Sequence, residues 1–364
     1  MSQFKIKWIR GRHNLGFTRP DVWFSIGQRG SGKSTFLEQV GCAYMEKSNA
    51  TVCDLFGSRD GEGLAWLRSP YAKEKRILLL KGENVDVKAP CKVMQVEKLT
   101  IRDLEKFDII ISSSPLYLSV DQEFVYAAKI TDLLFRRLHP KRLIYTICRE
   151  AANFYYSRLK VSESQTFAKA NMVYLIRESR HVWLALGLDS IRFYSIDIDI
   201  RSLADYMVVK SQGLSGLTKD LKWLYSYVEP HVVRKLRANQ FLILINSGEV
   251  GYGVSSDIEW HKKEKEDIMH ATGVKIEYGE ELKESEYRGS FHTVSDKQHA
   301  EIIKLHVEDD LGMGKIAKEV KRSSKTVSDH IKKHNVSVER SGFCPSCKRV
   351  GTPFFSVVVR KGTV

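Results

Sequence analysis

The stretch Gly27-Gln28-Arg29-Gly30-Ser31-Gly32-Lys33-Ser34 decides the fold of this chain. It matches the pattern G-x-x-x-x-G-K-[ST] at each fixed position, which is the signature of a phosphate-binding P-loop. A short apolar run at residues 22–26 precedes it and is typical of a buried strand. Residues 35–45, which follow it, have the pattern of a helix. We therefore predict a strand, a glycine-rich loop and a helix in succession, the context that this motif needs.

The residue types in this loop explain the chemistry that we expect of it. Glycines allow the backbone to curl until successive N–H groups face one anion, and the start of the helix adds favourable potential. Lys33 would reach the β- and γ-phosphates, and the Ser34 hydroxyl would bind Mg²⁺. The predicted cofactors are therefore ATP and Mg²⁺. The expected nucleotide-binding residues are Gly27, Gln28, Arg29, Gly30, Ser31, Gly32, Lys33, Ser34 and Thr35.

The composition limits the kind of protein that the chain encodes. Its 364 residues are enough for two or three domains, and 43% hydrophobic and 28% charged residues are ordinary for a globular protein. No apolar run reaches the ~18 residues of a membrane span, and the N-terminus lacks the apolar core of a secretory signal. We therefore expect a cytoplasmic protein with no membrane partner.

The charge of the chain favours a polyanionic partner. There are 58 Lys and Arg residues against 44 Asp and Glu residues, a formal net charge of +14. Residues 1–20 form a basic N-terminal arm in which residues 4–9 alternate like an edge strand. The basic side of that strand would contact phosphate or would simply face solvent. Double-stranded DNA is the partner that we expect.

Strand-like and helix-like segments alternate after the P-loop. This alternation predicts a parallel sheet, with residues 241–245 as its last strand. Asp54 lies at the end of the second strand, where open α/β sheets place ligand groups, so we expect it to contact the nucleotide. The other interpretation of Asp54 is a cap in the next loop. The buried strand at residues 142–148 leads into Glu150 and looks like a Walker B segment, whose glutamate orients and activates the attacking water.

The order of these parts resembles the HerA/FtsK superfamily of P-loop ATPases, ring-forming motors that pump or remodel DNA. The resemblance covers roughly residues 20–265. It rests on the P-loop and on three further features: Asp54 followed by Gly57, the segment Arg149-Glu150-Ala151-Ala152-Asn153, and Arg177 with Arg180-His181, followed by a strand and by residues 196–205.

This resemblance implies a RecA-like core with parallel strands and an ATPase activity. It assigns catalysis to Lys33 and Glu150, and to Arg177 or Arg180 supplied by a neighbouring subunit to the γ-phosphate. The two arginines would otherwise be ordinary charges at the end of a helix. The resemblance also implies a homo-oligomer, with a hexameric ring as one form.

The sequence departs from the family pattern at two places. Arg149 stands where the family usually has Asp before the catalytic Glu, which removes the usual carboxylate near Mg²⁺. Ile191 falls at the position of a sensor Gln, with Phe193 in place of the Pro that follows. Asp189 lies two residues from Ile191 and is a candidate substitute. These departures affect the expected rate of hydrolysis more than the expected binding of nucleotide.

The C-terminal part has a different pattern. Amphipathic segments at residues 296–308, 313–320 and 325–334 predict three helices that resemble a helix-turn-helix unit of the resolvase or sigma-like kind, with Ser324 as the cap of the third. The residues expected to contact DNA lie on this third helix or just before it: Ser323, Ser324, Lys325, Thr326, Ser328, Lys332 and Lys333. A small helical bundle that contacts protein is the alternative.

The tail contains one pair of closely spaced cysteines, Cys344 and Cys347. The pair looks like one knuckle of a zinc ribbon, but structural zinc takes four ligands and no second pair follows. His330, His334 or a second subunit would have to complete a zinc site. A knuckle that holds no metal is the other interpretation.

The predicted fold is α/β, with a P-loop NTPase core followed by a small all-α helix-turn-helix domain. The leading hypothesis for function is a DNA-binding ATPase that couples ATP hydrolysis to DNA translocation or remodelling. The second is an ATP-switched DNA-binding regulator with slow or no hydrolysis. The predicted parts are a basic arm (1–20), the P-loop ATPase domain (21–268), a connector (269–292), the helix-turn-helix (293–336) and the tail (337–364).

Overall fold

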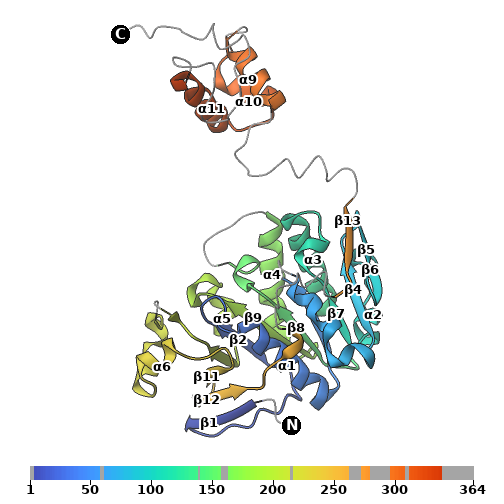
Figure 1. The fold of residues 1–364 in the computed structure, drawn as a ribbon, viewed down its shortest axis with the longest axis vertical. Helices are drawn as coiled ribbons and strands as arrows, with labels where there is room; N and C mark the ends of the chain where they lie inside the picture. Colours follow the sequence, from blue (N-terminus) through green and yellow to red (C-terminus); the bar gives the residue numbers. More distant parts are fainter. Residues whose placement is uncertain are drawn as a thin grey trace. The chain divides into compact units, whose positions relative to one another are not determined.

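Figure 1 shows the computed structural model, which describes residues 4–57, 61–137, 140–156, 163–213, 216–261, 272–278, 296–307 and 311–337. The chain divides into two compact units, residues 1–279 and residues 280–364. No helix within the described ranges is long and apolar enough to cross a membrane. The tail with Cys344 and Cys347 lies outside the described residues, so the zinc prediction stays a prediction.

The first unit is organised around one sheet with the strand order β1-β12-β11-β10-β2-β9-β8-β3-β7-β4-β6 (Figure 1). Within the described part of the chain, the strands from β10 to β6 in this order pair in parallel, and β11, β12 and β1 continue the sheet in antiparallel pairing. The bounds of these strands are β1 (Phe4–Arg10), β2 (Val22–Ile26), β3 (Thr51–Phe56), β4 (Ile77–Lys81), β6 (Lys92–Gln95), β7 (Ile109–Ile111), β8 (Ile144–Cys148), β9 (Leu184–Ser190), β10 (Tyr206–Val209), β11 (Gln240–Ile245) and β12 (Val250–Ser255).

Helices cover both faces of this sheet, and two apolar clusters separate the layers. Successive strand residues point to opposite faces, so Trp23 packs in the cluster that contains Phe36 of α1 while Phe24 packs in the cluster that contains Phe124 of α3. The predicted α/β class with a mainly parallel core is therefore confirmed. The helices of this unit are α1 (Lys33–Ser48), α2 (Ile101–Lys106), α3 (Val120–Phe135), α4 (Glu163–Glu178), α5 (Ile198–Ser202) and α6 (Pro230–Arg234).

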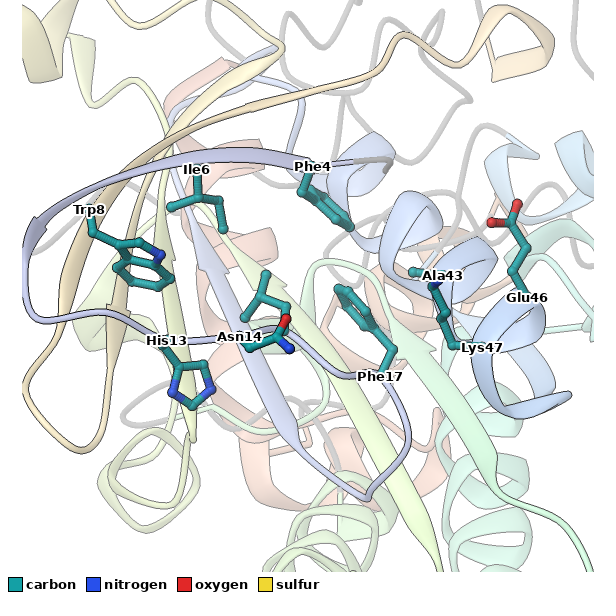
Figure 2. Close-up of a pocket in the computed structure, with 10 residues that line it drawn as sticks. Phe4, Ile6, Trp8, His13, Asn14, Phe17, Ala43, Glu46 and Lys47 are labelled. Atoms are coloured by element: carbon teal, nitrogen blue, oxygen red, sulfur yellow. The ribbon is translucent and has the colours of Figure 1, made fainter. Parts of the chain in front are cut away.

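The N-terminal residues belong to the first unit rather than forming a separate arm. β1 pairs with β12 at the edge of the sheet, which agrees with the edge strand expected there. Its apolar side lines a cavity of about 680 Å³ together with Phe17 and α1, as Figure 2 shows. Lys5 and Lys7 alternate with these apolar residues and are exposed. The prediction that residues 241–245 form the last strand of the sheet was wrong, because β12 follows β11.

The predicted connector, residues 269–292, contains a strand. β13 (Lys275–Tyr278) pairs with β5 (Val85–Lys88) in a separate two-stranded sheet. Val274 is buried and Ile276 packs against the same cluster as α1, so apolar burial holds this part of the chain to the first unit. After β12 the structure describes a short 3₁₀ turn, Glu259–His261, and residues 262–268 lie outside the described ranges.

The second unit contains α9 (Asp296–Val307), α10 (Met313–Glu319) and α11 (Ser324–Ser337), close to the three helices expected. They pack around one small apolar core made of Ile302, Ile316, Ala317, Val320, Val327 and Ile331. Ser323, not Ser324, caps α11. Its hydroxyl accepts a hydrogen bond from the Thr326 N–H at 3.1 Å, and Ser324 is already the first helical residue.

Candidate functional site

The candidate site lies at the carboxyl ends of three neighbouring parallel strands. β2 leads into the P-loop, β8 leads into Arg149 and Glu150, and β9 lies between them. The last residues of β9, which include Asp189, therefore lie between the P-loop and the segment that contains Arg149 and Glu150. This arrangement brings Lys33, Ser34 and Glu150 to the same end of the sheet, and their roles in nucleotide binding and catalysis stay predictions.

The P-loop has the backbone that its glycines require. Gly30 and Gly32 have φ angles of +74° and +79°, in the left-handed region that favours glycine. Any Cβ at Gly32 would lie 2.4 Å from the carbonyl oxygen of Ala238. Residues 28–30 are exposed, and α1 begins at Lys33. The loop thus presents backbone N–H groups and a helix N-terminus, which together favour an anion.

Lys33 and Ser34 occupy the positions expected for phosphate and metal ligands. The Lys33 ammonium is buried and donates to the carbonyl oxygen of Gln28 at 3.2 Å, so it is folded back over the loop. The Ser34 hydroxyl donates to a carboxylate oxygen of Asp189 at 3.1 Å. Thr35 is half-buried in the first turn of the helix.

Asp189 connects the two halves of the site. Its carboxylate accepts from the Ser34 hydroxyl and, at 2.5 Å, from the backbone N–H of Glu150. Burial raises the pKa of Asp189, whereas Lys33 and these hydrogen bonds oppose the shift. The sequence offered Asp189 as a substitute for a missing sensor Gln. In the structure it provides an acidic group beside the Ser34 hydroxyl.

Glu150 lies next to this cluster in a strained backbone conformation. Its φ and ψ are 46° and 47°, in the left-handed region that few residues other than glycine adopt. Its side chain is half-buried. Burial and the Asp189 carboxylate raise the pKa of Glu150, and Lys33 opposes the shift. A carboxylate with a raised pKa beside the P-loop has the properties of a general base.

Arg149 is fully buried and is neutralised by carboxylates. Its guanidinium donates to both oxygens of Asp54, at 3.0 and 2.5 Å, and also to Glu38. A further contact of 3.3 Å joins it to Glu62. Burial alone would lower the pKa of Arg149, but Asp54 and Glu38 raise it above its usual value. Arg149 is therefore a charged group inside the protein and is not a ligand for Mg²⁺.

Asp54 is placed differently from the sequence expectation. It is fully buried, and besides Arg149 it accepts from the indole N–H of Trp66 at 2.9 Å. These partners occupy both of its oxygens. The structure therefore gives Asp54 a role in neutralising Arg149, and we do not include it among the groups that hold the nucleotide.

Lys210 is a residue of this site that the sequence reasoning missed. It follows β10, and its backbone N–H donates to the carbonyl oxygen of Ile26 at the start of the P-loop. Its ammonium is buried between the rings of Phe36 and Phe241 and donates to the Ala238 carbonyl at 2.7 Å. Burial lowers the pKa of Lys210 to about 7. No local signal marks it, because the burial depends on segments that are distant in sequence.

Arg177 and Arg180 lie away from the P-loop of their own chain. Arg177 is exposed in the last turn of α4. Arg180 forms an exposed ion pair of 3.2 Å with Asp205, which precedes β10 at the amino ends of the parallel strands. The P-loop follows the carboxyl end of β2, at the opposite edge. A catalytic role for either arginine thus needs a neighbouring subunit and stays a prediction.

The predicted DNA contacts fall on the exposed start of α11. Ser323, Ser324 and Lys325 are exposed, and Thr326 and Ser328 are half-buried. Lys332 and Lys333 belong to the same helix, but their side chains lie outside the described residues. The Arg322 guanidinium donates to the side-chain amide oxygen of Gln298 and so joins the turn to α9.

The residues near Ser34 fit a magnesium ion. Mg²⁺ prefers hard oxygen ligands and usually retains several waters, and the Ser34 hydroxyl together with nucleotide phosphates supplies such oxygens. Asp189 accepts from this hydroxyl and would orient it. Within the described ranges, no group of three or more His, Cys, Asp or Glu side chains forms an all-protein metal site.

No protein-family model and no curated protein matches the sequence. Among solved structures, the chain is similar to the genome packaging NTPase B204 from Sulfolobus turreted icosahedral virus 2 in complex with ATP-gammaS. The identity is 17%, the TM-score is 0.38, and the match covers 64% of this chain and 96% of that one. It is also similar to the cytoplasmic domain of the Thermomonospora curvata Type VII secretion ATPase EccC, with 13% identity, a TM-score of 0.39, and coverage of 67% and 24%. At this level the likeness does not assign an activity to this chain.

Proposed function

We propose that this protein is a Mg²⁺-dependent ATPase that acts on DNA. The observation that carries the ATPase part is the convergence of four side chains at the carboxyl ends of β2, β9 and β8. Lys33 and Ser34 begin α1 at the P-loop, and Asp189 hydrogen-bonds both Ser34 and the backbone of Glu150. Phosphoryl transfer to water needs these groups: hydrogen-bond donors to the phosphates, a metal ligand and a general base.

Each residue has a role in the proposed reaction. The loop N–H groups and Lys33 hold the β- and γ-phosphates, and Ser34 binds the magnesium ion that offsets their charge. Asp189 keeps the Ser34 hydroxyl oriented toward the metal. Glu150 orients the attacking water and takes its proton, which a carboxylate of raised pKa does better than an ordinary one.

The DNA part of the proposal is supported by the second unit and by the net charge. Three helices around a small apolar core, joined by a tight turn between α10 and α11, suit a helix-turn-helix. In this proposal, the exposed start of α11 enters the major groove. The protein forms a homo-oligomeric ring, in which Arg177 or Arg180 of a neighbour reaches the γ-phosphate. ATP turnover then drives translocation or remodelling of DNA.

One observation favours the second candidate function, a DNA-binding regulator switched by ATP. Arg149 replaces a carboxylate beside the catalytic Glu and is neutralised inside the protein. Asp189 is then the acidic group that accepts the hydrogen bond of the Ser34 hydroxyl. If Asp189 does not fully replace the missing carboxylate, hydrolysis is slow and nucleotide binding sets the state of the protein.

ATP hydrolysis by the purified full chain, with and without double-stranded DNA, separates these candidates. Stimulation by DNA that Lys33→Ala and Glu150→Gln both abolish is expected for a motor. Tight ATP binding without turnover, with DNA affinity that changes on nucleotide binding, would favour the regulator. Absence of ATP binding by the parent protein would contradict both.

The DNA contact has its own test in Lys325→Glu. We expect roughly tenfold weaker DNA binding, because the change reverses a charge at the exposed start of α11. ATP binding should not change. Lys304→Glu is the matched control, since Lys304 is exposed on α9 of the same unit. Equal DNA affinity of Lys325→Glu and the parent at low salt would remove α11 from the interface.

A further inference from the structure

A second cavity adjoins the P-loop on the side of the antiparallel strands. Its volume is about 140 Å³. Gly32, Thr35 and Gln39 form the wall on the α1 side, and residues 238–239 and 255–258 form the opposite wall. The cavity thus starts at a residue of the P-loop itself and continues along the first turns of α1. A molecule whose phosphates lie on the P-loop can extend directly into it.

Gln39 points to what this cavity binds. Its side chain is only 2% exposed, and neither its amide oxygen nor its amide nitrogen has a hydrogen-bond partner among the described residues. Buried polar groups are nearly always hydrogen-bonded, because leaving one unpaired is costly. An amide in the wall of a cavity with both atoms unpaired therefore indicates a ligand that supplies a donor and an acceptor side by side.

The edge of an adenine base supplies this pair. The Gln oxygen accepts from the exocyclic amino group and the Gln nitrogen donates to the neighbouring ring nitrogen, as glutamine pairs with adenine elsewhere. The wall opposite Gln39 is held close to the P-loop: the Ala238 carbonyl lies against Gly32 and accepts from Lys210. The cavity and the phosphate site thus keep a fixed spacing, which a nucleotide that bridges them requires.

We propose that this cavity binds the adenine base of the nucleotide and that Gln39 recognises its edge. The proposal rests on the proposed function, in which the P-loop holds the phosphates of the same molecule. Gln39 is then a residue that determines specificity for the base. It does not take part in the chemical step.

Binding of ATP and of inorganic tripolyphosphate to the full chain, measured by calorimetry, tests this proposal. For Gln39→Leu we expect about tenfold weaker ATP binding, equivalent to ~1.4 kcal/mol, and unchanged binding of tripolyphosphate, which has no base. Lys33→Ala should weaken both. Equal ATP affinity of Gln39→Leu and the parent, or an equal loss for both ligands, would overturn the role of Gln39. A parent that binds neither ligand would instead refute the proposed function.

Thermal unfolding without nucleotide separates recognition from a structural role. Gln39→Leu removes an unpaired buried amide, so its Tm should equal or exceed that of the parent. Gln165→Leu is the matched control: Gln165 is also buried on a helix, but its amide bonds the Asn153 carbonyl, so its Tm should fall. A fall for Gln39→Leu like that of Gln165→Leu would contradict the proposal.

Two more comparisons complete the test. Gln39→Asn keeps an amide but shortens it by one methylene, so we expect it to fold and to bind ATP more weakly with tripolyphosphate binding unchanged. Full ATP affinity in Gln39→Asn would count against an edge contact. The parent should bind ATP more tightly than GTP, and equal affinity would overturn the assignment to adenine.

Discussion

At the scale of single residues, the buried charge of Arg149 has the largest predicted effect on stability. Arg149→Met leaves Asp54 and Glu38 buried without their cation. Removing one partner of a buried ion pair typically costs about 3–5 kcal/mol, so we expect the free energy of unfolding in urea to fall by that amount. Arg149→Lys retains the charge but loses the forked hydrogen bonds. Its free energy of unfolding should lie between those of the parent and Arg149→Met.

The control for this prediction is Arg180→Met. Arg180 pairs with Asp205, but its side chain is 74% exposed. Exposed pairs contribute up to about 1 kcal/mol, so this variant should be close to the parent. An Arg149→Met protein as stable as Arg180→Met would show that the buried carboxylates do not depend on Arg149.

Lys210 gives a prediction with a definite pH dependence. Its native pKa of about 7 lies below the value of 10.5 for a free lysine. Between these values the unfolded chain binds a proton that the native protein does not, so stability relative to Lys210→Met rises with pH by at most about 1.4 kcal/mol per unit. Below pH 7 both states bind the proton and the difference becomes constant. Urea unfolding of both proteins from pH 6 to 10 measures it; a constant difference across the whole range would contradict the prediction.

The sequence predicted those site residues that belong to one contiguous motif. Lys33 and Ser34 are fixed by the P-loop pattern, and Glu150 by the strand that precedes it. The partners of Arg149 could not be predicted, because Glu38 lies on α1, 111 positions earlier. Gln39 and Lys210 gave no signal for the same reason. Their environment is created by segments that meet only in the folded chain.

At the scale of secondary-structure elements, the cap of α11 supplies a prediction. Ser323→Ala removes the hydroxyl that accepts from the Thr326 N–H, so the second unit should lose about 1 kcal/mol. Ser324→Ala is the control, since Ser324 lies inside the helix, where Ala is favourable. Hydrogen exchange of the α11 amides in the full chain measures both variants. Equal protection in the two would mean that the cap does not stabilise α11.

The sequence analysis missed β12, and the glycines of this strand explain why. β12 has glycines at 251 and 253, which weaken a strand signal. Yet the sheet requires Gly253, because its Cβ would lie 2.2 Å from the Phe241 ring. Strands β2, β3 and β8 were predicted because they are mainly apolar runs, and they are buried on both faces. The pairing of β12 with β1 and β11 depends on partners that no local pattern reveals.

At the scale of the whole molecule, Arg177 and Arg180 lie on the opposite side of the sheet from the P-loop of their own chain. Lys33, Ser34, Asp189 and Glu150 lie at the carboxyl ends of the parallel strands. Arg177, in the last turn of α4, and Arg180 lie toward the amino ends. In a ring built by head-to-tail contacts, that other side of a chain can face the nucleotide of its neighbour. In the proposed ring, each ATPase site therefore takes its P-loop from one subunit and its arginine from the next.

Mixing two inactive variants tests whether neighbouring subunits share an ATPase site. Lys33→Ala lacks a working P-loop, and Arg177→Ala lacks the proposed arginine but keeps its P-loop. If Arg177 acts on the neighbouring site, an equal mixture contains about a quarter of sites with both groups intact, since each subunit supplies one half of a heterologous contact. The mixture should regain a matching fraction of the parent ATPase rate, whereas neither variant does alone. Arg180→Ala, tested in the same way, tells which of the two arginines is used. If no mixture regains activity although each variant assembles with the parent, neither arginine completes a neighbouring site, and the ATPase must work with the residues of one chain.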